Sequence, residues 1–469
     1  MSPQDSSTGE GLTGLRGWFG RRDRLLIFAL GLALGIAAGV ALASEGATRI
    51  WIDPDSTGSA TPADTTSLSA ASEQSGPEDT HDGVLGDLPS EGAGLDGPEG
   101  TPSENANVEA TVVNVRDHGA SGDGKSNDRK SIQAALDSAG AGDTVYLPAG
   151  VYSVDRAPSE AWAIRVPSGI TLRGEGGESV IRLAADQGEW VRVLTVATSE
   201  DVAIEQLTVD GNAQGQEVES EQRHGIFVDR SQHVTVRDVV VRYTTGDGIY
   251  FHGRSSGVVE GSRAYGGEGA RVAFNFQGAE DAVFHGNYAE AYDVGYKAEV
   301  NENSPSVRKV RVVQNVSRET PNGIAINGHS SGSFVFDVVI EGNDFEFTSD
   351  DGFWIKDARG LVIRDNVFRR PSGGTGFYIR GNVQETVIES NVVPGAETAV
   401  AINEYVGFSR DLTIRNNRFP DAEVGLEVLV DGSVGSVVFT GNQLAPGARV
   451  VLNPGFVKPP LEIQGNWVG

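Results

Sequence analysis

The sequence predicts an all-β solenoid, in which each short coil of chain stacks on the next. The first observation is an asparagine that returns at intervals of 28, 28, 23, 25, 26, 25 and 24 residues. The second is an apolar residue three positions before each asparagine, within an apolar alternation typical of a strand. A period of this length indicates a repeat architecture, and stacked asparagine amides can hydrogen-bond from coil to coil. The asparagines are Asn287, Asn315, Asn343, Asn366, Asn391, Asn417, Asn442 and Asn466.

The same pattern gives the number of coils. Coil starts can be read at eleven places between Val202 and Leu461, and one more coil can be read around residues 170–183. We therefore expect about twelve coils. At a strand spacing of about 4.8 Å they would form a rod of roughly 55 Å.

The chain before the solenoid divides into three parts. Residues 1–24 carry arginines, and residues 25–43 are 19 apolar or glycine residues, about enough to span a bilayer. The positive-inside rule then predicts a cytoplasmic N-terminus, a single transmembrane helix and a body outside the cell. Cleavage after Ala43 as part of a signal peptide is the alternative and would give a secreted protein. Residues 44–108 are acidic and poor in aromatic residues, which predicts a disordered linker before the domain of residues 109–469.

Composition excludes several functions. The formal net charge of −28 argues against nucleic-acid binding through a basic surface. The absence of cysteine excludes disulfides, thiol catalysis and cysteine-ligated zinc.

The start of the body carries a family resemblance. Asp128 is a plausible N-cap for a short helix with an apolar face that includes Ile132 and Leu136. The stretch NVRDHGASGDGKSNDRKSIQAAL, followed by GDTVYLPAGVY, resembles the N-terminal signature of the pectate-lyase superfamily domain, although His118 replaces the usual Phe or Tyr. The resemblance implies a right-handed parallel β-helix whose N-terminal helix caps the end of the solenoid.

A second strand in each coil points to the candidate site. It is marked by a small residue and an apolar one, as in Gly225-Ile226 and Gly376-Phe377. Because strand side chains alternate, stacking should give two outward files of residues. The first is predicted as Phe227, Tyr250, Ala273, Lys297, Ala325, Trp354, Tyr378, Ala401 and Glu427, and the second as Asp229, His252, Asn275, Glu299, Asn327, Lys356, Arg380, Asn403 and Leu429.

Aromatic side chains beside charges and amides suit a sugar polymer, although an ordinary solvated sheet face has a similar composition. We predict that a polysaccharide contacts Tyr250, His252, Lys297, Glu299, Asn327, Trp354, Tyr378 and Asn403.

Lys356 and Arg380 should occupy equivalent positions on adjacent coils, about 5 Å apart. Two cations this close repel, which favours a neutral lysine able to act as a base. A uronic-acid carboxylate between them would allow removal of the adjacent proton and β-elimination. The segment WIKDARGLVIRDNVFRRPSGGTGFYIRGN also resembles the Lys-then-Arg coils of the polysaccharide lyase family that contains chondroitinase B and β-helical alginate lyases. The resemblance implies Lys356 as base and Arg380 as acid.

That family also holds a calcium ion with acidic residues shortly before the lysine. Asp350 and Asp351 are near this offset, but the family's Glu-x-Glu pattern is absent. Ca²⁺ is therefore the one cofactor that the sequence suggests.

Three alternatives stay open. Hydrolysis needs two carboxylates at close range; the TGDGI and SDDG segments resemble polygalacturonase motifs but should lie four coils apart, about 20 Å. Epimerisation of a uronate shares the first step of elimination, although the Asp-Pro-His motif of β-helical alginate epimerases is missing. The third is a non-catalytic surface protein that binds glycan. We expect a membrane-anchored extracellular protein that acts on an anionic, uronic-acid polysaccharide by β-elimination.

Overall fold

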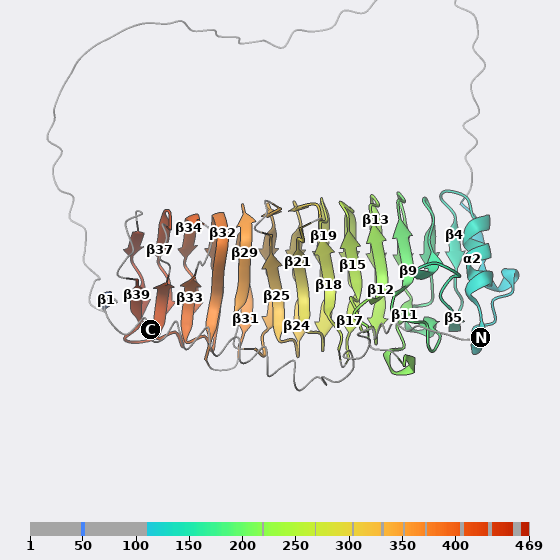
Figure 1. The fold of residues 1–469 in the computed structure, drawn as a ribbon, viewed down its shortest axis with the longest axis horizontal. Coiled ribbons are helices and arrows are strands. Elements are labelled where there is room, and N and C mark those ends of the chain that lie inside the picture. The colour runs from blue at the N-terminus through green and yellow to red at the C-terminus, as the bar shows by residue number, and fades with distance from the viewer. Residues whose placement is uncertain are drawn as a thin grey trace, which may run out of the picture. The chain divides into compact units, whose positions relative to one another are not determined.

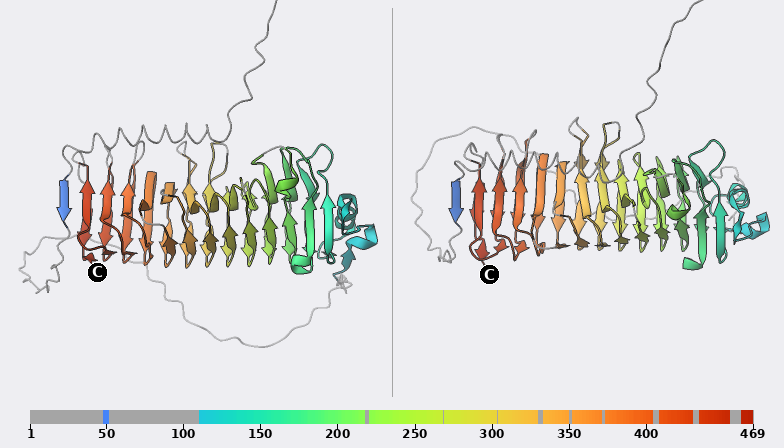
Figure 2. Two further views of the ribbon diagram at one scale, coloured as in Figure 1. Left: turned by 90° about the horizontal axis from the view of Figure 1, so that it is seen from below. Right: turned by 60° about the horizontal axis from the view of Figure 1, so that its bottom comes forward.

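The chain winds into a parallel β-solenoid of about twelve coils, as the asparagine period predicts (Figure 1). The computed structural model describes residues 48–51, 110–217, 220–267, 269–302, 304–329, 333–349, 352–370, 373–403, 408–429, 434–453 and 461–468. Most coils contribute three strands, and each strand pairs in parallel with its counterparts in the coils on either side (Figure 2).

The first stack of strands carries the outward files, and we call it the wall. Its strands are β6 (Trp162–Arg165), β9 (Val191–Ala197), β12 (Arg223–Asp229), β15 (Ile249–His252), β18 (Val272–Gln277), β21 (Val294–Glu299), β25 (Asn322–Asn327), β29 (Phe353–Arg359), β32 (Thr375–Glu389), β33 (Thr398–Ile402), β36 (Val424–Val428) and β39 (Arg449–Leu452).

The second stack follows the wall in each coil. Its strands carry the apolar alternation that precedes each ladder asparagine. Its strands are β2 (Val112–Asn114), β4 (Thr144–Tyr146), β7 (Thr171–Arg173), β10 (Ala203–Glu205), β13 (Val234–Arg237), β16 (Gly257–Glu260), β19 (Ala282–His285), β23 (Arg311–Val313), β27 (Val339–Glu341), β30 (Val362–Arg364), β34 (Arg410–Arg415), β37 (Val437–Thr440) and β40 (Leu461–Gln464). The end of β32 belongs to this stack as well, since it pairs with β30 and β34. Two short strands, β22 (Val307–Arg308) and β26 (Val335–Phe336), pair at the turn between the stacks.

The third stack closes each coil. Its strands are β3 (Asp123–Asn127), β5 (Gly150–Val154), β8 (Ser179–Leu183), β11 (Thr208–Asp210), β14 (Val240–Arg242), β17 (Arg263–Tyr265), β20 (Tyr288–Glu290), β24 (Val316–Arg318), β28 (Asp344–Glu346), β31 (Val367–Arg369), β35 (Arg418–Phe419), β38 (Gln443–Leu444) and β41 (Trp467–Val468). The apolar side chains of all three stacks point inward into one continuous core.

The predicted asparagine ladder is confirmed. All eight asparagines are buried, and each side-chain oxygen accepts from the preceding coil. Asn366, for example, accepts from the backbone and side-chain nitrogens of Asn343 at 2.9 and 2.8 Å. Its own amide donates to Ile340 O and to Asn391 Oδ1, both at 2.9 Å. The ladder thus satisfies polar groups at the turn between the second and third stacks.

A column of small residues lies at or next to the start of many wall strands, with Gly225, Gly248 and Ala273 in successive coils. A Cβ atom added at Gly225 would lie 2.6 Å from the carbonyl oxygen of Gly248, and one added at Gly248 would lie 2.6 Å from that of Ala273. Larger side chains in this column would push the coils apart, so the column fixes the register of the wall.

At the N-terminal end, helix α2 (Arg129–Ser138) buries Ile132, Ala135 and Leu136 in the core. Three short 3₁₀ turns, η1 (Val115–His118), η2 (Gly176–Glu178) and η3 (Ala213–Gly215), complete the elements of the described coils. The carboxylate of Asp128 accepts from the backbone of Ser121 and Gly122, so it holds the preceding loop and makes no side-chain cap bond to α2.

The predicted location as a single-pass membrane protein needs correction. Among the residues that the structure describes, no helix is long and apolar enough to cross a bilayer. A single-pass anchor requires such a helix, because a helix satisfies its backbone polar groups within one segment. Residues 1–24 and 25–43 lie outside the described residues, as does most of the predicted linker. Within the linker range, Thr48–Trp51 form strand β1, which pairs antiparallel with β39.

Candidate functional site

Backbone pairing across the wall fixes which side chains are neighbours. In the first file Phe227 lies beside Tyr250, Tyr250 beside Asn275, and Asn275 beside Lys297. From Lys297 to Glu427 the predicted order is confirmed. In the second file His252 lies between Asp229 and Gln277.

The prediction for β18 is therefore wrong by two residues. Ala273 is buried and belongs to the column of small residues, because Ile249 pairs with Phe274. Asn275 consequently stands in the first file, and Gln277 takes the predicted place of Asn275 in the second.

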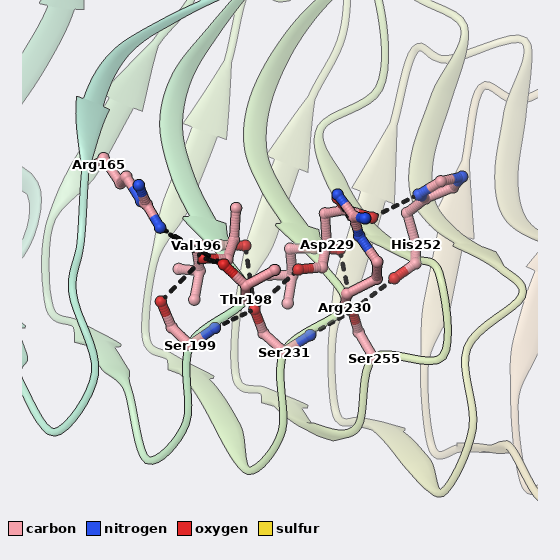
Figure 3. Close-up of polar contacts among 11 residues, drawn as sticks. Arg165, Val196, Thr198, Ser199, Asp229, Arg230, Ser231, His252 and Ser255 are labelled. Carbon is pink, nitrogen blue, oxygen red and sulfur yellow. Dashed lines mark hydrogen bonds and ion pairs between the residues drawn. The ribbon is translucent and has the colours of Figure 1, made fainter.

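Asp229 and His252 form a hydrogen-bonded pair at the end of two adjacent wall strands (Figure 3). The His252 Nδ1 atom lies 2.8 Å from Asp229 Oδ1, and Arg230 contacts the other carboxylate oxygen at 2.9 Å. Burial alone would raise the pKa of Asp229, but the bonds from His252 and Arg230 outweigh it and lower that pKa. Asp229 therefore stays ionised and orients the imidazole, as a carboxylate does for a general base.

A short serine ladder holds the turn behind this pair (Figure 3). The hydroxyl of Ser231 accepts from the backbone nitrogen of Ser199 at 3.1 Å and donates to the Asp229 carbonyl at 2.9 Å. Ser255 accepts in the same way from Ser231 at 3.2 Å. The ladder fixes the ends of β9, β12 and β15, and hence the positions of Asp229 and His252.

The phenol of Tyr250 lies next to His252, with ring centroids 5.6 Å apart. Its hydroxyl donates to Gln277 Oε1, and the Gln277 amide donates to Ser304 Oγ at 2.9 Å. Burial raises the pKa of Tyr250 well above its usual value, with Asp247 adding to the effect. Tyr250 is thus a protonated group that can donate.

A buried ionic network lies beneath Tyr250. The carboxylate of Asp247 is fully buried and accepts from Arg271 Nε at 3.0 Å, Arg271 Nη2 at 3.2 Å and Asn275 Nδ2 at 2.9 Å. The backbone nitrogen of Asp247 donates to His224 Nδ1 at 2.9 Å. Burial lowers the pKa of His224 to about 4, so this imidazole is neutral and carries its hydrogen on Nε2.

An open hollow of about 420 Å³ adjoins His252. It is lined by Asp229, Arg230, His252, Gly253, Arg254 and Pro305. Gly253 has a φ of 67°, and a Cβ there would lie 2.7 Å from Asp229 Oδ1, so a glycine is needed for the carboxylate to approach. A sugar ring can therefore reach the exposed edge of the His252 imidazole.

A second cluster lies further along the wall. The Trp354 and Tyr378 rings are 6.0 Å apart, and the Arg380 guanidinium lies 5.3 and 5.5 Å from their centroids. Asn403 Nδ2 donates to the Tyr378 hydroxyl at 3.0 Å. Flat rings next to a cation form a suitable surface for an acidic sugar.

The predicted adjacency of Lys356 and Arg380 is confirmed by strand pairing. Lys356 Nζ lies 3.8 Å from the buried carboxylate of Asp357. In the preceding coil Asn327 pairs with Lys356, and in the coil before that Glu299 pairs with Asn327. Their catalytic roles stay a prediction.

Lys297 contacts Glu299 at 2.8 Å, so these two predicted binding residues form an ion pair in the wall. The calcium candidates Asp350 and Asp351 lie outside the described residues. Within the described ranges, no group of three or more His, Asp or Glu side chains could hold a metal ion.

Comparison with known proteins agrees with this fold. Residues 112–296 match the family model described as rhamnogalacturonase A/epimerase, pectate lyase-like, and residues 300–448 match the right handed beta helix region. The chain is a pectate-lyase-like, right-handed parallel β-helix protein.

Several relatives of this β-helix protein come from Azotobacter vinelandii. It is 34% identical over 194 residues to the mannuronan C5-epimerase AlgE4, a match that covers 38% of this chain and 34% of the relative. It is 40% identical over 114 residues to alginate lyase 7, covering 23% of this chain and 13% of the relative. The matched segments thus span about a third or less of these relatives' lengths.

Solved structures share the fold. The A-module of the mannuronan C-5 epimerase AlgE6 from Azotobacter vinelandii superposes with a TM-score of 0.62 and 21% identity, over 76% of this chain and 99% of that one. PfbA, a surface adhesin of Streptococcus pneumoniae, gives 0.55 and 16% identity, over 71% of this chain and 90% of that one.

Several contacts of the His252 cluster do not follow from the sequence pattern. Asp229 was available as the neighbour of His252 in the predicted file. The Asp247–Arg271 pair was not, because it depends on the course of the loop before β18. Gln277 is absent from the predicted second file, because the register error at Ala273 puts Asn275 in its place.

Proposed function

We propose that this β-helix protein is an enzyme that acts on a uronic-acid polysaccharide and begins by removing the proton at C5 of one uronate residue. The observation that carries the proposal is the cluster of Asp229, His252 and Tyr250 on an outward wall with cationic and aromatic side chains. The similarity to epimerases and a lyase named for mannuronan and alginate supports the same substrate class.

His252 is the proposed base. Its Nδ1 atom is engaged by Asp229, which leaves Nε2 to take the C5 proton. The electron pair left on C5 then delocalises into the carboxylate of the same sugar. Arg271, which Asp247 holds at 3.0 Å and whose side chain is 28% exposed, is the cation that we propose to face this carboxylate.

Tyr250 is the proposed acid, because burial keeps its phenol protonated. In β-elimination, the C4–O4 bond breaks, a C4–C5 double bond forms, and O4 receives a proton from Tyr250. In epimerisation, the C4–O4 bond stays intact, and Tyr250 gives its proton to C5 on the face opposite to His252. Both outcomes share the step at His252. The sequence pattern favours elimination, whereas the similarity to mannuronan C5-epimerases favours epimerisation.

Lys356 and Arg380, the predicted base and acid, adjoin at another place on the wall. We assign them to binding, since Arg380 lies against the rings of Trp354 and Tyr378, an arrangement suited to holding a sugar and its carboxylate. Whether Ca²⁺ takes part stays a prediction that chelation during the assay will test.

The test uses the full-length chain with alginate, pectate and glycosaminoglycans. Unsaturated-uronate absorbance reports elimination, and a changed ratio of epimers in proton NMR reports epimerisation. His252→Gln should abolish either signal, whereas Lys356→Ala should keep the turnover at saturating polymer. The matched control is His233→Gln, because His233 forms a similar pair with Asp201 at 3.1 Å away from the wall strands.

New reducing ends without either signal would indicate hydrolysis and contradict the proposal. If Lys356→Ala loses turnover and His252→Gln retains it, the Lys356–Arg380 pair is the reaction centre. Polymer binding with no reaction would leave a glycan-binding protein.

A further inference from the structure

Arg192 is a half-buried cation in the wall, and no described residue is its counter-ion. It lies on β9, paired with His224 of the next coil. Its guanidinium carbon is 4.6 Å from the centroid of the Phe227 ring, and its buried Nε atom has no hydrogen-bond partner among the described residues. In the part of the chain that the structure describes, it makes no ion pair, and Asp229 acts on it only at longer range. Burial lowers the pKa of Arg192, as expected for a cation without a partner.

Comparable arginines on the solenoid do have partners. Arg242 lies 3.1 Å from Asp210, and Arg318 lies 2.8 Å from Asp344. Their side chains are about one-third exposed, so partial burial with a carboxylate is the usual arrangement on this solenoid. Burying a charge without compensation costs stability, and such a group calls for an explanation.

The surroundings of Arg192 are aromatic. Trp162 pairs with it on the side away from His224. Trp190 directly precedes β9 and is 52% exposed. The neighbouring hydroxyl of Thr195, in the file that continues to Phe227, is also buried, and no residue in the described ranges hydrogen-bonds to it. The Phe227 ring lies against the guanidinium, and the two tryptophans lie on or next to β6 and β9. Aromatic rings and a cation on neighbouring strands match the two halves of a uronate: its apolar ring face and its carboxylate.

We propose that Arg192 binds the carboxylate of a uronate residue in a subsite on the N-terminal side of the His252 centre, with Trp190 and Trp162 contacting sugar rings. The proposal rests on the proposed function, since it takes the polymer to be polyuronate. Arg380 has the same character on the other side: it lies against two rings and makes no ion pair within the described ranges. The two arginines therefore bracket the reaction centre.

Strand order sets their distances from His252. Two strand steps separate β9 from β15, and five separate β15 from β32. At about 4.8 Å per step, Arg192 lies roughly 10 Å and Arg380 roughly 24 Å along the wall from His252. A short oligosaccharide bound at the centre reaches Arg192 but not Arg380.

The experiment measures binding of mannuronate oligosaccharides by isothermal titration calorimetry. A tetrasaccharide should bind Arg192→Gln about tenfold more weakly than the wild type, the loss of one charge-assisted pair. Arg192→Lys should recover part of the affinity, and Trp190→Ala should weaken binding independently of the charge. Arg380→Gln should weaken binding only of longer oligosaccharides. The control is Arg415→Gln, which removes an equal charge from the second stack, where Arg415 pairs with Glu389 at 2.7 Å.

A tetrasaccharide whose carboxylates have been reduced to alcohols should bind the wild type and Arg192→Gln equally. If the wild type binds the acidic tetrasaccharide and Arg192→Gln binds it just as well, the Arg192 subsite is wrong while the proposed function stands. If the wild type binds neither tetrasaccharide nor polymer, the proposed function itself fails. Should Arg192→Gln fold poorly, an unchanged affinity in both Arg192→Lys and Trp190→Ala would overturn the subsite.

Discussion

Replacing one asparagine inside the ladder should destabilise the solenoid strongly. Asn366→Leu removes two bonds that the side-chain oxygen accepts from Asn343 and two that the amide donates, to Ile340 O and Asn391 Oδ1. At about 1 kcal/mol for each bond, the four bonds contribute about 4 kcal/mol to the free energy of unfolding. The full loss is expected because the backbone nitrogen of Asn343 is left buried without an acceptor.

The assay is urea unfolding followed by far-UV circular dichroism. Asn466→Leu, at the end of the ladder, removes three bonds and should cost less, about 3 kcal/mol. The double variant Asn366→Leu, Asn391→Leu should cost less than the sum of the single variants, because one bond joins the two side chains. A loss below about 1 kcal/mol for Asn366→Leu would refute the view that the amides hold the coils together.

Three further predictions concern the wall. His224 has a pKa of about 4 when folded against 6.5 in the unfolded chain, so the unfolded state binds the extra proton between these values. Stability should therefore fall by about 3 kcal/mol as the pH drops from about 6.5 to about 4, and urea unfolding should show no such contribution in His224→Gln. Asp229→Asn should lower kcat about a hundredfold with little change in KM, because the imidazole loses its orienting carboxylate; equal kcat values would contradict this. Lys356→Ala should raise KM for long polymers with kcat retained, and a lost kcat would instead favour Lys356 as the base.

The sequence was sufficient for the solenoid because its repeat appears in side chains with one physical role. Asn287 through Asn466 mark the same buried turn, and the apolar residue before each marks the same strand. The same repeat period correctly predicts that Lys356 lies beside Arg380 and Trp354 beside Tyr378. It did not place Asn275, because Arg271 and Ala273 both precede an apolar residue and only close packing against Gly248 selects Ala273.

The reaction centre was harder to predict than the wall. His252 and Tyr250 were recognised as surface groups, but their roles depend on partners from other coils: Asp229, Gln277 and Arg271. Such contacts depend on side-chain directions, which apolar periodicity does not encode. Arg192 was missed because its significance lies in lacking a partner.

The most direct test of the central claim is hydrogen exchange at C5. Polyuronate incubated with the full-length protein in deuterium oxide should either gain deuterium at C5 or lose the C5 hydrogen to an unsaturated product, as followed by proton NMR. His252→Gln should show neither change, while His233→Gln should behave as the wild type. Unaltered C5 hydrogens in every polyuronate tested with the wild-type protein, or wild-type exchange in His252→Gln, would contradict proton removal by His252.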